Sequence, residues 1–242
     1  MPDWLRRSPR EEPTVEVGGT VLPVAIRRLR TARRMTLRLA PDGREARLSI
    51  PHWARTAEAL AFARSRADWL AAQLANLPAP RQLGPGGALP YRGELLNIEH
   101  SPKARRTPER LEGAVLLGGP EESVALRLQR WLQAEARVLL ADDLAHYCDK
   151  AALPVPPLSL SGAQRRWGSC SARGEIRINW RLIMAPDLVR RSVVAHEVTH
   201  LLHFDHSPRF KATLDGLFEG EVAEADRWLK REGRSLYTWF AA

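Results

Sequence analysis

His196-Glu197-Val198-Thr199-His200 decides how this chain is interpreted, because it has the spacing HExxH and is followed six residues later by His206. Two histidines four residues apart lie on one face of an α-helix, one turn apart, so both can reach one metal ion. Zinc accepts neutral imidazole, and catalytic zinc sites commonly have three protein ligands and a water. We therefore predict one Zn²⁺ per chain, held by His196, His200 and His206.

Glu197 is predicted to be the catalytic base. It lies about 100° further round the helix than His196, so it borders the metal without binding it. A carboxylate at this position can take a proton from a zinc-bound water and later deliver one to the leaving group. Pro186 and Asp187 mark the start of the helix, and Ser207-Pro208 has the pattern of a cap and first residue of the next one.

His203 is the competing ligand. It falls within about 20° of His196 on an ideal helix but about 10 Å further along the axis, which is too far to share one ion. His203 could pair with His200, but His196 and Glu197 would then have no role. We therefore predict that His203 is a neighbour of the site. A polar helix end without metal is the simpler alternative, and a glutamate at the catalytic position argues against it.

The segment before this helix has the pattern of a hairpin. Ile176 and Ile178 alternate with polar residues, which predicts a strand, and Ser171–Gly174 would be the turn. We expect its partner in the run from Leu158 to Trp167. A strand edge beside the helix could hold an extended substrate. Trp167 and Trp180 are at least as easily explained by core packing, and the candidate substrate-binding residues of the segment are Arg166, Ser169 and Asn179.

The motifs resemble the YgjP-like metallopeptidase family, which is related to the SprT-like and WLM zincins. The resemblance rests on Arg166–Ser171, Gly174, Ile178–Leu182, Pro186, the HExxH motif, and His206-Ser207 with Phe210. A softer resemblance extends over roughly residues 20–235. It implies a zinc hydrolase with His196, His200 and His206 as ligands and Glu197 as base. Thr199 and Lys211 depart from the family pattern and could alter the pocket wall.

The metzincins share the spacing of the three histidines. In that class a glycine occupies the place of His203, where the chain turns sharply, and a methionine turn follows. No methionine follows Met184 in this sequence, so we exclude the metzincins.

Composition limits the class of protein. The chain has 242 residues, of which 44% are hydrophobic, enough for an ordinary core. The sequence contains no run of 18 apolar residues, so no membrane span is predicted. Met1–Pro13 does not have the pattern of a signal peptide. Cys148 and Cys170 do not make a disulfide framework, so we expect a cytoplasmic protein without a membrane partner.

Arginine dominates the net charge of +9. A dense N-terminal cluster could be a phosphate-binding stripe: Arg27, Arg28, Arg30, Arg33, Arg34 and Arg38. A biased genome composition would give the same excess of arginine, and we favour that explanation here.

The expected fold is α+β: an N-terminal β-rich segment with a helix, then a zincin-like domain with a small sheet and the HExxH helix. We expect a mobile tail at 1–18, the β-rich region at 19–118 and the catalytic domain at 119–242. The β-rich region should contain short strands near 20–30, 33–40 and 45–50, one helix from Thr56 to Leu77, and further strands within 91–118. A linker is expected at 77–90, a long helix at about 121–151, and short helices near 208–215 and 221–232.

Three functions fit these features. The first is a zinc metallopeptidase that acts on a peptide or protein. The second is a metal-dependent nucleotide pyrophosphatase or phosphohydrolase, in which Arg165, Arg166 and Arg173 could hold phosphates, although the same arginines could simply be solvated. The third is a DNA-associated protease of the SprT-like kind, anchored to nucleic acid by the N-terminal arginines, which rests on analogy.

Overall fold

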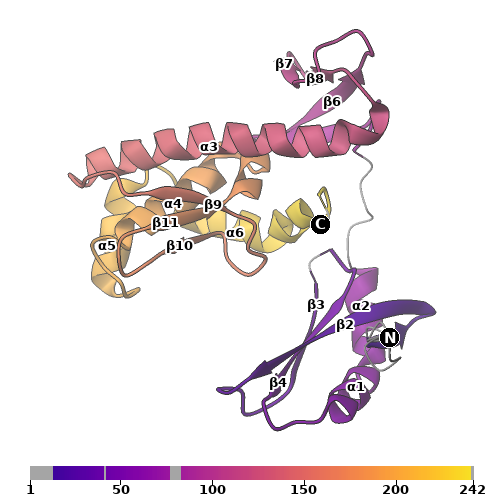
Figure 1. The fold of residues 1–242 in the computed structure, drawn as a ribbon. Coiled ribbons are helices and arrows are strands. Elements are labelled where there is room, and N and C mark those ends of the chain that lie inside the picture. Colours follow the sequence, from indigo (N-terminus) through magenta and orange to yellow (C-terminus); the bar gives the residue numbers. More distant parts are fainter. Residues whose placement is uncertain (1–12, 41, 77–82, 241–242) are drawn as a thin grey trace, which may run out of the picture. The chain divides into compact units, whose positions relative to one another are not determined.

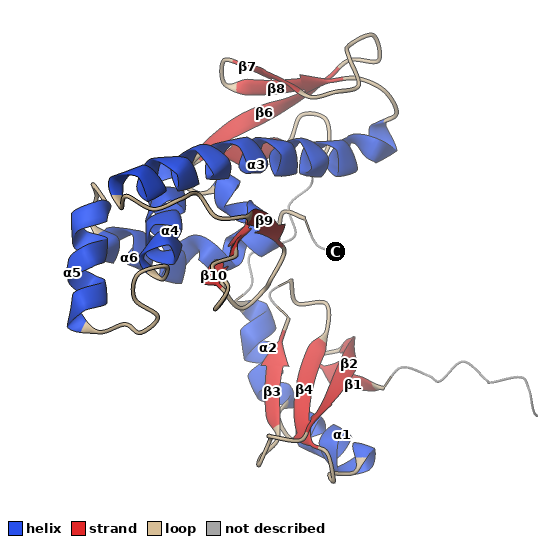
Figure 2. Ribbon diagram, turned by 60° about the vertical axis from the view of Figure 1, so that its left-hand side comes forward, coloured by secondary structure: helices blue, strands red, loops and turns tan. Residues whose placement is uncertain are grey.

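The computed structural model describes residues 13–40, 42–76 and 83–240 and divides the chain into two compact units, Met1–Ala79 and Pro80–Ala242. The fold is α+β, as expected, and each unit has its own buried core (Figure 1). Figure 2 shows that helices and strands occur in both units. Across the described ranges, no helix has both the length and the apolar character needed to cross a membrane.

The first unit is a four-stranded sheet with two helices. The strands have the order β1-β2-β4-β3, and their bounds are Thr14–Val17, Thr20–Leu29, Ala46–Pro51 and Thr36–Leu39 in that order. One predicted helix is in fact two, α1 (Thr56–Arg64) and α2 (Ala67–Ala75), because the chain leaves helical geometry at Ser65-Arg66. The prediction of a mobile tail up to residue 18 was wrong for its described part, since β1 pairs with β2. Residues 1–12 lie outside the described ranges.

Alternation of side chains along the strands gives this sheet one buried face. Val15, Leu22, Val24, Leu48 and Ile50 point to the core, where they meet buried residues of both helices. The residues between them point to the opposite face, because successive side chains of a strand alternate. The helices therefore cover one face of this sheet, and among the described residues of the unit no helix or strand covers the other face, which we call the open face.

The second unit begins with a sheet of order β5-β6-β8-β7, whose strands are Ala88–Tyr91, Glu94–His100, Ala114–Leu117 and Glu109–Leu111 in that order. It packs on the long helix α3 (Val124–Lys150), which follows the short 3₁₀ helix η2 (Glu121–Ser123). These strands share one core with the catalytic segment. The predicted boundary at 118/119 was therefore wrong, and the chain divides at 79/80, within the predicted linker.

A hairpin tip explains why these strands belong with the catalytic segment. Arg92 and Gly93, between β5 and β6, both have positive φ, and their N–H groups donate to Ile183 and Met184. A side chain at Gly93 would come within 3.0 Å of Pro186, so glycine is required for this approach. The tip thus docks directly before the HExxH helix.

A three-stranded sheet lies beside that helix, with order β10-β11-β9. β11 (Ile176–Asn179) forms the predicted hairpin through the turn at 171–175, but its partner is β10 (Gly168–Cys170). The expected partner strand, β9 (Leu158–Ser161), instead lies parallel to β11 on the other side. β10 is therefore an edge strand.

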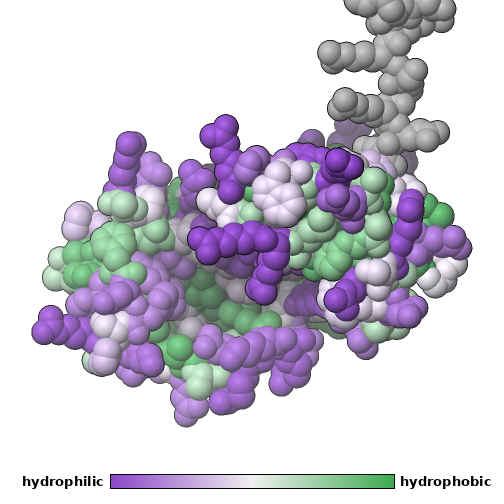
Figure 3. Space-filling model, turned by 90° about the horizontal axis from the view of Figure 1, so that it is seen from below, coloured by the Kyte–Doolittle hydropathy of each residue, from purple (hydrophilic) through white to green (hydrophobic). Residues whose placement is uncertain are grey.

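The remaining elements surround the metal-site helix, α4 (Asp187–Thr199). The 3₁₀ helix η3 (Trp180–Met184) leads into it, α5 (Pro208–Leu217) and α6 (Val222–Glu232) follow it, and η4 (Gly233–Tyr237) is the last helix within the described residues. The predicted short helices agree with α5 and α6. The surface seen in Figure 3 is mostly hydrophilic, with smaller apolar areas between the polar side chains.

A buried ion pair fixes α4 against α3. The Arg190 side chain is 3% exposed, and its Nε donates to Asp143 Oδ2 at 2.7 Å. Arg190 also bonds Asp187, which in turn bonds Arg92 at the hairpin tip. The network thus joins three segments at the start of α4.

Removal of Asp143 should be costly. Asp143→Ala would leave the Arg190 charge buried without its main partner, and such losses destabilise proteins by roughly 3–5 kcal/mol. Glu232→Ala is the control, because it breaks an exposed pair with Arg231 and should change stability by about 1 kcal/mol or less. Urea unfolding followed by circular dichroism measures both variants. Equal unfolding midpoints would contradict the anchoring role of Arg190 and Asp143.

Candidate metal centre and active site

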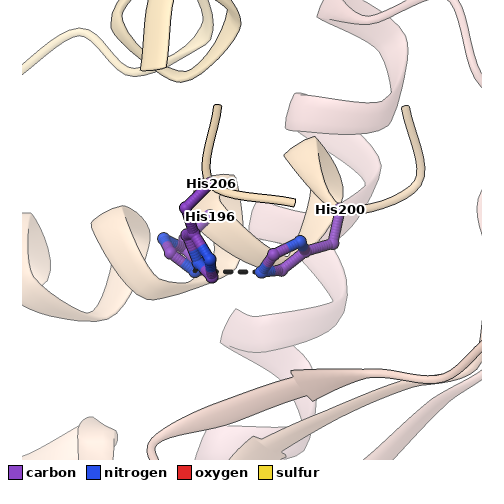
Figure 4. Close-up of side chains that lie close together, drawn as sticks. All are labelled: His196, His200 and His206. Atoms are coloured by element: carbon purple, nitrogen blue, oxygen red, sulfur yellow. Dashed lines mark hydrogen bonds between the residues drawn. The ribbon is translucent and has the colours of Figure 1, made fainter. Parts of the chain in front are cut away.

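α4 and the turn after it bring the three predicted ligands together. His196 lies in the last turn of α4, and His200 caps its C-terminal end. His206 lies in the turn before α5, where the Ser207 hydroxyl accepts a hydrogen bond from the Phe210 N–H at 3.4 Å. Ser207 is thus the predicted N-cap and Pro208 the first residue of the helix. This cap returns the chain toward α4, and the three rings face one another (Figure 4).

The distances fit one tetrahedral ion. Nε2 of His196 lies 3.2 Å from Nε2 of His200 and 3.2 Å from Nε2 of His206. Ligands about 2.0–2.1 Å from zinc at tetrahedral angles are separated by about 3.3 Å. One ligand atom from each histidine lies within 4.8 Å of the others. The residues present therefore fit a metal held by three histidines.

Hydrogen bonding and burial prepare the rings for this role. Nδ1 of His200 lies 3.1 Å from the carbonyl oxygen of His203, which favours a proton on Nδ1 and leaves the Nε2 lone pair for metal. Burial, followed by the nearby His200 and His206, lowers the pKa of His196 to about 4. Burial is also the main cause that lowers the pKa of His200. Neutral imidazole is the form that binds zinc.

Phe210 belongs to the motif that carries the family resemblance, but its contact with the candidate ligands was not predicted. Its ring is buried, and its centroid lies 4.9, 4.7 and 4.7 Å from those of His196, His200 and His206. One aromatic ring thus packs against all three candidate ligands. The spacing of Phe210, three residues after the cap Ser207, was the available signal.

His203 lies outside the ligand group. Its ring Nε2 lies 3.1 Å from the Thr213 hydroxyl, and its backbone carbonyl, not its ring, serves His200. Thr199, the departure inside the motif, is buried, and its hydroxyl donates to the carbonyl of Ala195 within the same helix at 2.8 Å.

Glu197 points from α4 toward β10. The residue is 5% exposed, and the backbone N–H of Cys170 bonds its carboxylate. Burial raises the pKa of Glu197 to about 7, while the Arg166 charge and the Cys170 N–H act in the opposite direction. Among the described residues, Oε2 of Glu197 has no hydrogen-bond partner. A buried carboxylate oxygen without a partner, in a residue that lines the same cavity as His196 and His206, suits a proton acceptor that faces substrate.

Gly168 makes room for this carboxylate. A methyl group at Gly168 would lie 2.6 Å from Cγ of Glu197 and closer still to Oε1. Any side chain at this position would displace the glutamate or the strand. The sequence motif contained Gly168, but the reason for a glycine was visible only in the structure.

The three candidate substrate-binding residues lie in different environments. Arg166 is exposed, and its charge acts on Glu197. Ser169 lies half-buried in β10, opposite Arg177. Asn179 is fully buried: its amide donates to the Ala163 carbonyl at 2.7 Å and to the Tyr237 hydroxyl at 2.9 Å, and it caps η3. The interpretation of Asn179 as substrate-binding was therefore wrong, because its polar groups are used within the fold.

A cavity of about 360 Å³ opens beside the metal centre. His196, Glu197 and His206 line one part of it, and Lys211 and Asp226 are its other charged residues. Its apolar lining consists of Trp167, Val193, Phe210, Leu214, Val222 and Leu229. Trp167 combines two roles, because it also packs on Tyr237 with ring centroids 5.4 Å apart. Trp180, by contrast, is a core residue packed on Phe240.

The fold and the centre define a metallopeptidase of the HExxH class. The model of the family described as YgjP-like, metallopeptidase domain matches residues 33–232, and the chain belongs to this family. The family implies a hydrolase that uses a metal, and the histidine cluster could bind one.

A solved structure, described as the metallopeptidase zymogen of Pyrococcus abyssi abylysin, is similar over 39% of this chain and 96% of its own. The sequence identity is 22% and the TM-score is 0.36. A comparison with curated proteins gave no match.

Metal content should separate His200 from His203. His200→Ala removes one of three nitrogens and should lower bound zinc well below one per chain. His203→Ala keeps the backbone carbonyl that orients His200, so it should retain most of the metal. Elemental analysis after dialysis measures both. Loss of metal in His203→Ala equal to that in His206→Ala would show that the ligand assignment is wrong.

Gly168→Ala should impair catalysis while metal is retained. The added methyl group displaces the Glu197 carboxylate, and a shift of about 1 Å at a catalytic group can cost about 10²-fold in rate. Gly162→Ala is the control, because its nearest neighbour to an added methyl lies 3.9 Å away. Peptide cleavage and zinc content are measured for both. A Gly168→Ala enzyme as fast as Gly162→Ala would show that this contact does not position Glu197.

Proposed function

We propose that this chain is a zinc-dependent metallopeptidase in which Glu197 is the general base. The observation that carries the proposal is that Glu197 lines the same cavity as His196 and His206 and also contacts the edge strand β10 at Gly168 and Cys170. A proton acceptor, a metal centre and a strand edge at one place are what hydrolysis of an extended peptide requires.

Zinc at the three histidines would polarise the scissile carbonyl and lower the pKa of its water ligand. Glu197 would take the proton of the attacking water and deliver it to the leaving amine. The raised pKa of Glu197, about 7, suits a group that both gains and loses a proton near neutral pH. The positive charge of the metal would act against this rise and favour the carboxylate form.

The hydrogen-bond pattern of β10 supports substrate binding along its edge. The Asn179 N–H donates to the Trp167 carbonyl at 2.7 Å, and the Ser171 N–H donates to the Glu175 carbonyl at 2.9 Å. In an antiparallel pair the bonded residues alternate, so the backbone groups of Gly168 and Cys170 point away from β11. Cys170 uses its N–H to bond Glu197. The backbone of Gly168 is then placed to pair with a peptide strand next to the base.

The cavity supports a peptide with a bulky apolar side chain. Val193, Leu214, Val222 and Leu229 give it aliphatic walls directly beside the histidines. Apolar walls with a few placed polar groups are typical of ligand sites of this size. We propose that the side chain next to the scissile bond enters this cavity.

The same lining argues against the phosphohydrolase. Arg165, Arg166 and Arg173, which would have to hold the phosphates, are exposed and do not line the cavity. Lys211 is the cation that does, and Asp226 is also part of the wall. A triphosphate needs several converging cations, so a peptide fits this site better.

Glu197→Gln tests the proposal, because it keeps size and hydrogen bonding but removes the proton acceptor. We expect zinc retention and a rate of peptide cleavage lower by about 10²–10⁴. Wild type and variant, both loaded with zinc, are compared on a peptide pool and on a nucleotide panel. Near-normal cleavage by the variant refutes the role of Glu197. Nucleotide hydrolysis without peptide cleavage by wild type refutes the peptidase.

A further inference from the structure

The first unit carries most of the net positive charge of the described residues. Residues 13–76 contain eleven arginines, no lysine and five acidic residues, a net charge of +6. Residues 83–240 contain eighteen arginines, four lysines and twenty acidic residues, a net charge of +2, over more than twice the length. Arginine occurs in both units, and the imbalance in net charge comes from its higher density in the first unit together with the smaller number of acidic residues there.

The strand register places three of these arginines on one surface. Arg38 of β3 lies directly opposite Arg47 of β4, and Arg47 lies beside Ala25 of β2. Arg27 follows two residues later on β2, beside Ser49. All three side chains alternate with the buried residues of their strands and are exposed. They therefore project from the open face of the sheet, opposite α1 and α2.

The open face continues into the connection between β2 and β3. Arg30, Arg33 and Arg34 lie in this connection and are exposed. It leaves the sheet at the end nearest Arg27, because β2 ends and β3 begins there. Arg28 is excluded from this surface, because its guanidinium donates to the Ala54 carbonyl and to the Thr56 hydroxyl.

Two of the three charges on this face, those of Arg27 and Arg38, have no acidic partner among the described residues. Like charges directly opposite one another on adjacent strands are destabilising, as for Arg38 and Arg47. Arg47 has an exposed ion pair with Glu45 at 2.5 Å, which contributes little in water. Within the described ranges, Arg27 and Arg38 form no ion pair. A face that keeps opposed arginines at a cost to stability is expected to bind an anion.

The chemistry of the face favours one class of anion. The residues between the arginines are small or polar, Ala25, Thr36 and Ser49. Val21 is an exposed apolar side chain on the same face, but it lies six residues before Arg27 on β2, so the part with the arginines lacks the apolar side chains that insert into a membrane. Arginine, not lysine, supplies the charge, and its planar fork matches phosphate oxygens. A row of cations that runs along a sheet and past its end matches a chain of phosphates better than a single acidic group.

We propose that this open face, with Arg27, Arg38 and Arg47, binds the phosphate backbone of a nucleic acid without sequence preference. The proposal does not depend on the metal centre or on the reaction at Glu197. Binding through phosphates should be strongly salt-dependent, because each neutralised phosphate releases counterions.

The test measures the Kd of two full-length triple variants and of wild type for a fluorescently labelled DNA of about 20 nucleotides, both single-stranded and duplex. The variant Arg27→Gln/Arg38→Gln/Arg47→Gln removes the three positive charges of the open face. Arg106→Gln/Arg130→Gln/Arg137→Gln makes the same change in charge at exposed positions of the second unit. We expect the first to raise Kd at least tenfold in 50 mM salt and to lower the salt slope by about 2–3 for duplex DNA. We expect the second to change Kd by less than threefold.

Equal losses in the two triple variants would overturn the proposal, since net charge alone would then explain binding. Tighter wild-type binding to polyglutamate or to phosphatidylserine vesicles than to DNA would overturn it in favour of an acidic protein or a membrane.

The single variant Arg38→Thr tests whether weaker DNA binding could result from misfolding. It removes the charge opposite Arg47, and threonine is well suited to a β-strand. We expect its melting temperature to equal or exceed that of wild type while DNA binding weakens. A lower melting temperature with unchanged DNA binding would show that Arg38 is structural.

Discussion

Three imidazole nitrogens held close together, with Nε2 of His196 3.2 Å from Nε2 of both His200 and His206, are the constraint on which the rest of the site depends. Neutral rings whose lone pairs point at one place repel each other, and a cation between them removes that repulsion. Buried polar groups and a tight turn of the chain hold the three rings in these positions. The His203 carbonyl orients one ring, Ser207 returns the chain, and Phe210 packs against all three rings.

The burial of Glu197 follows from the same arrangement. A carboxylate that is 5% exposed is unfavourable in isolation, and its pKa rises for that reason. The cost is tolerated because the strand approaches closely at Gly168 and donates from Cys170. α4 must hold its position against this strand, and the buried pair of Arg190 with Asp143 anchors its other end. The residues that anchor α4 therefore lie near its N-terminal end, and the residues of the candidate active site lie near its C-terminal end.

The sequence predicted the parts of the site that depend on local spacing. His196, His200 and Glu197 follow from helical geometry, and His206 from the cap at Ser207-Pro208, because each involves neighbours within one or two turns. Pairings between distant segments were not predictable in this way. β9 has the composition of a hairpin partner, but the short turn gives that place to β10. The boundary at 118/119 failed because two backbone hydrogen bonds from the Arg92-Gly93 tip join the preceding strands to η3.

Polar residues were misread where their partners came from far along the chain. Asn179 looked available beside the motif, yet it bonds Tyr237, which lies 58 residues later. The arginines show the opposite case. As a list they indicate only composition, but the register of β2, β3 and β4 puts Arg27, Arg38 and Arg47 on one face while Arg28 turns to the other. Because side chains alternate along a strand, arginines at every second position lie together on one face of the sheet. The cavity with apolar walls lies in the other unit, whose net charge is close to zero. The two units thus present different surfaces: one has a cavity with mostly apolar walls, and the other has an arginine-rich face, for which we propose a polyanion.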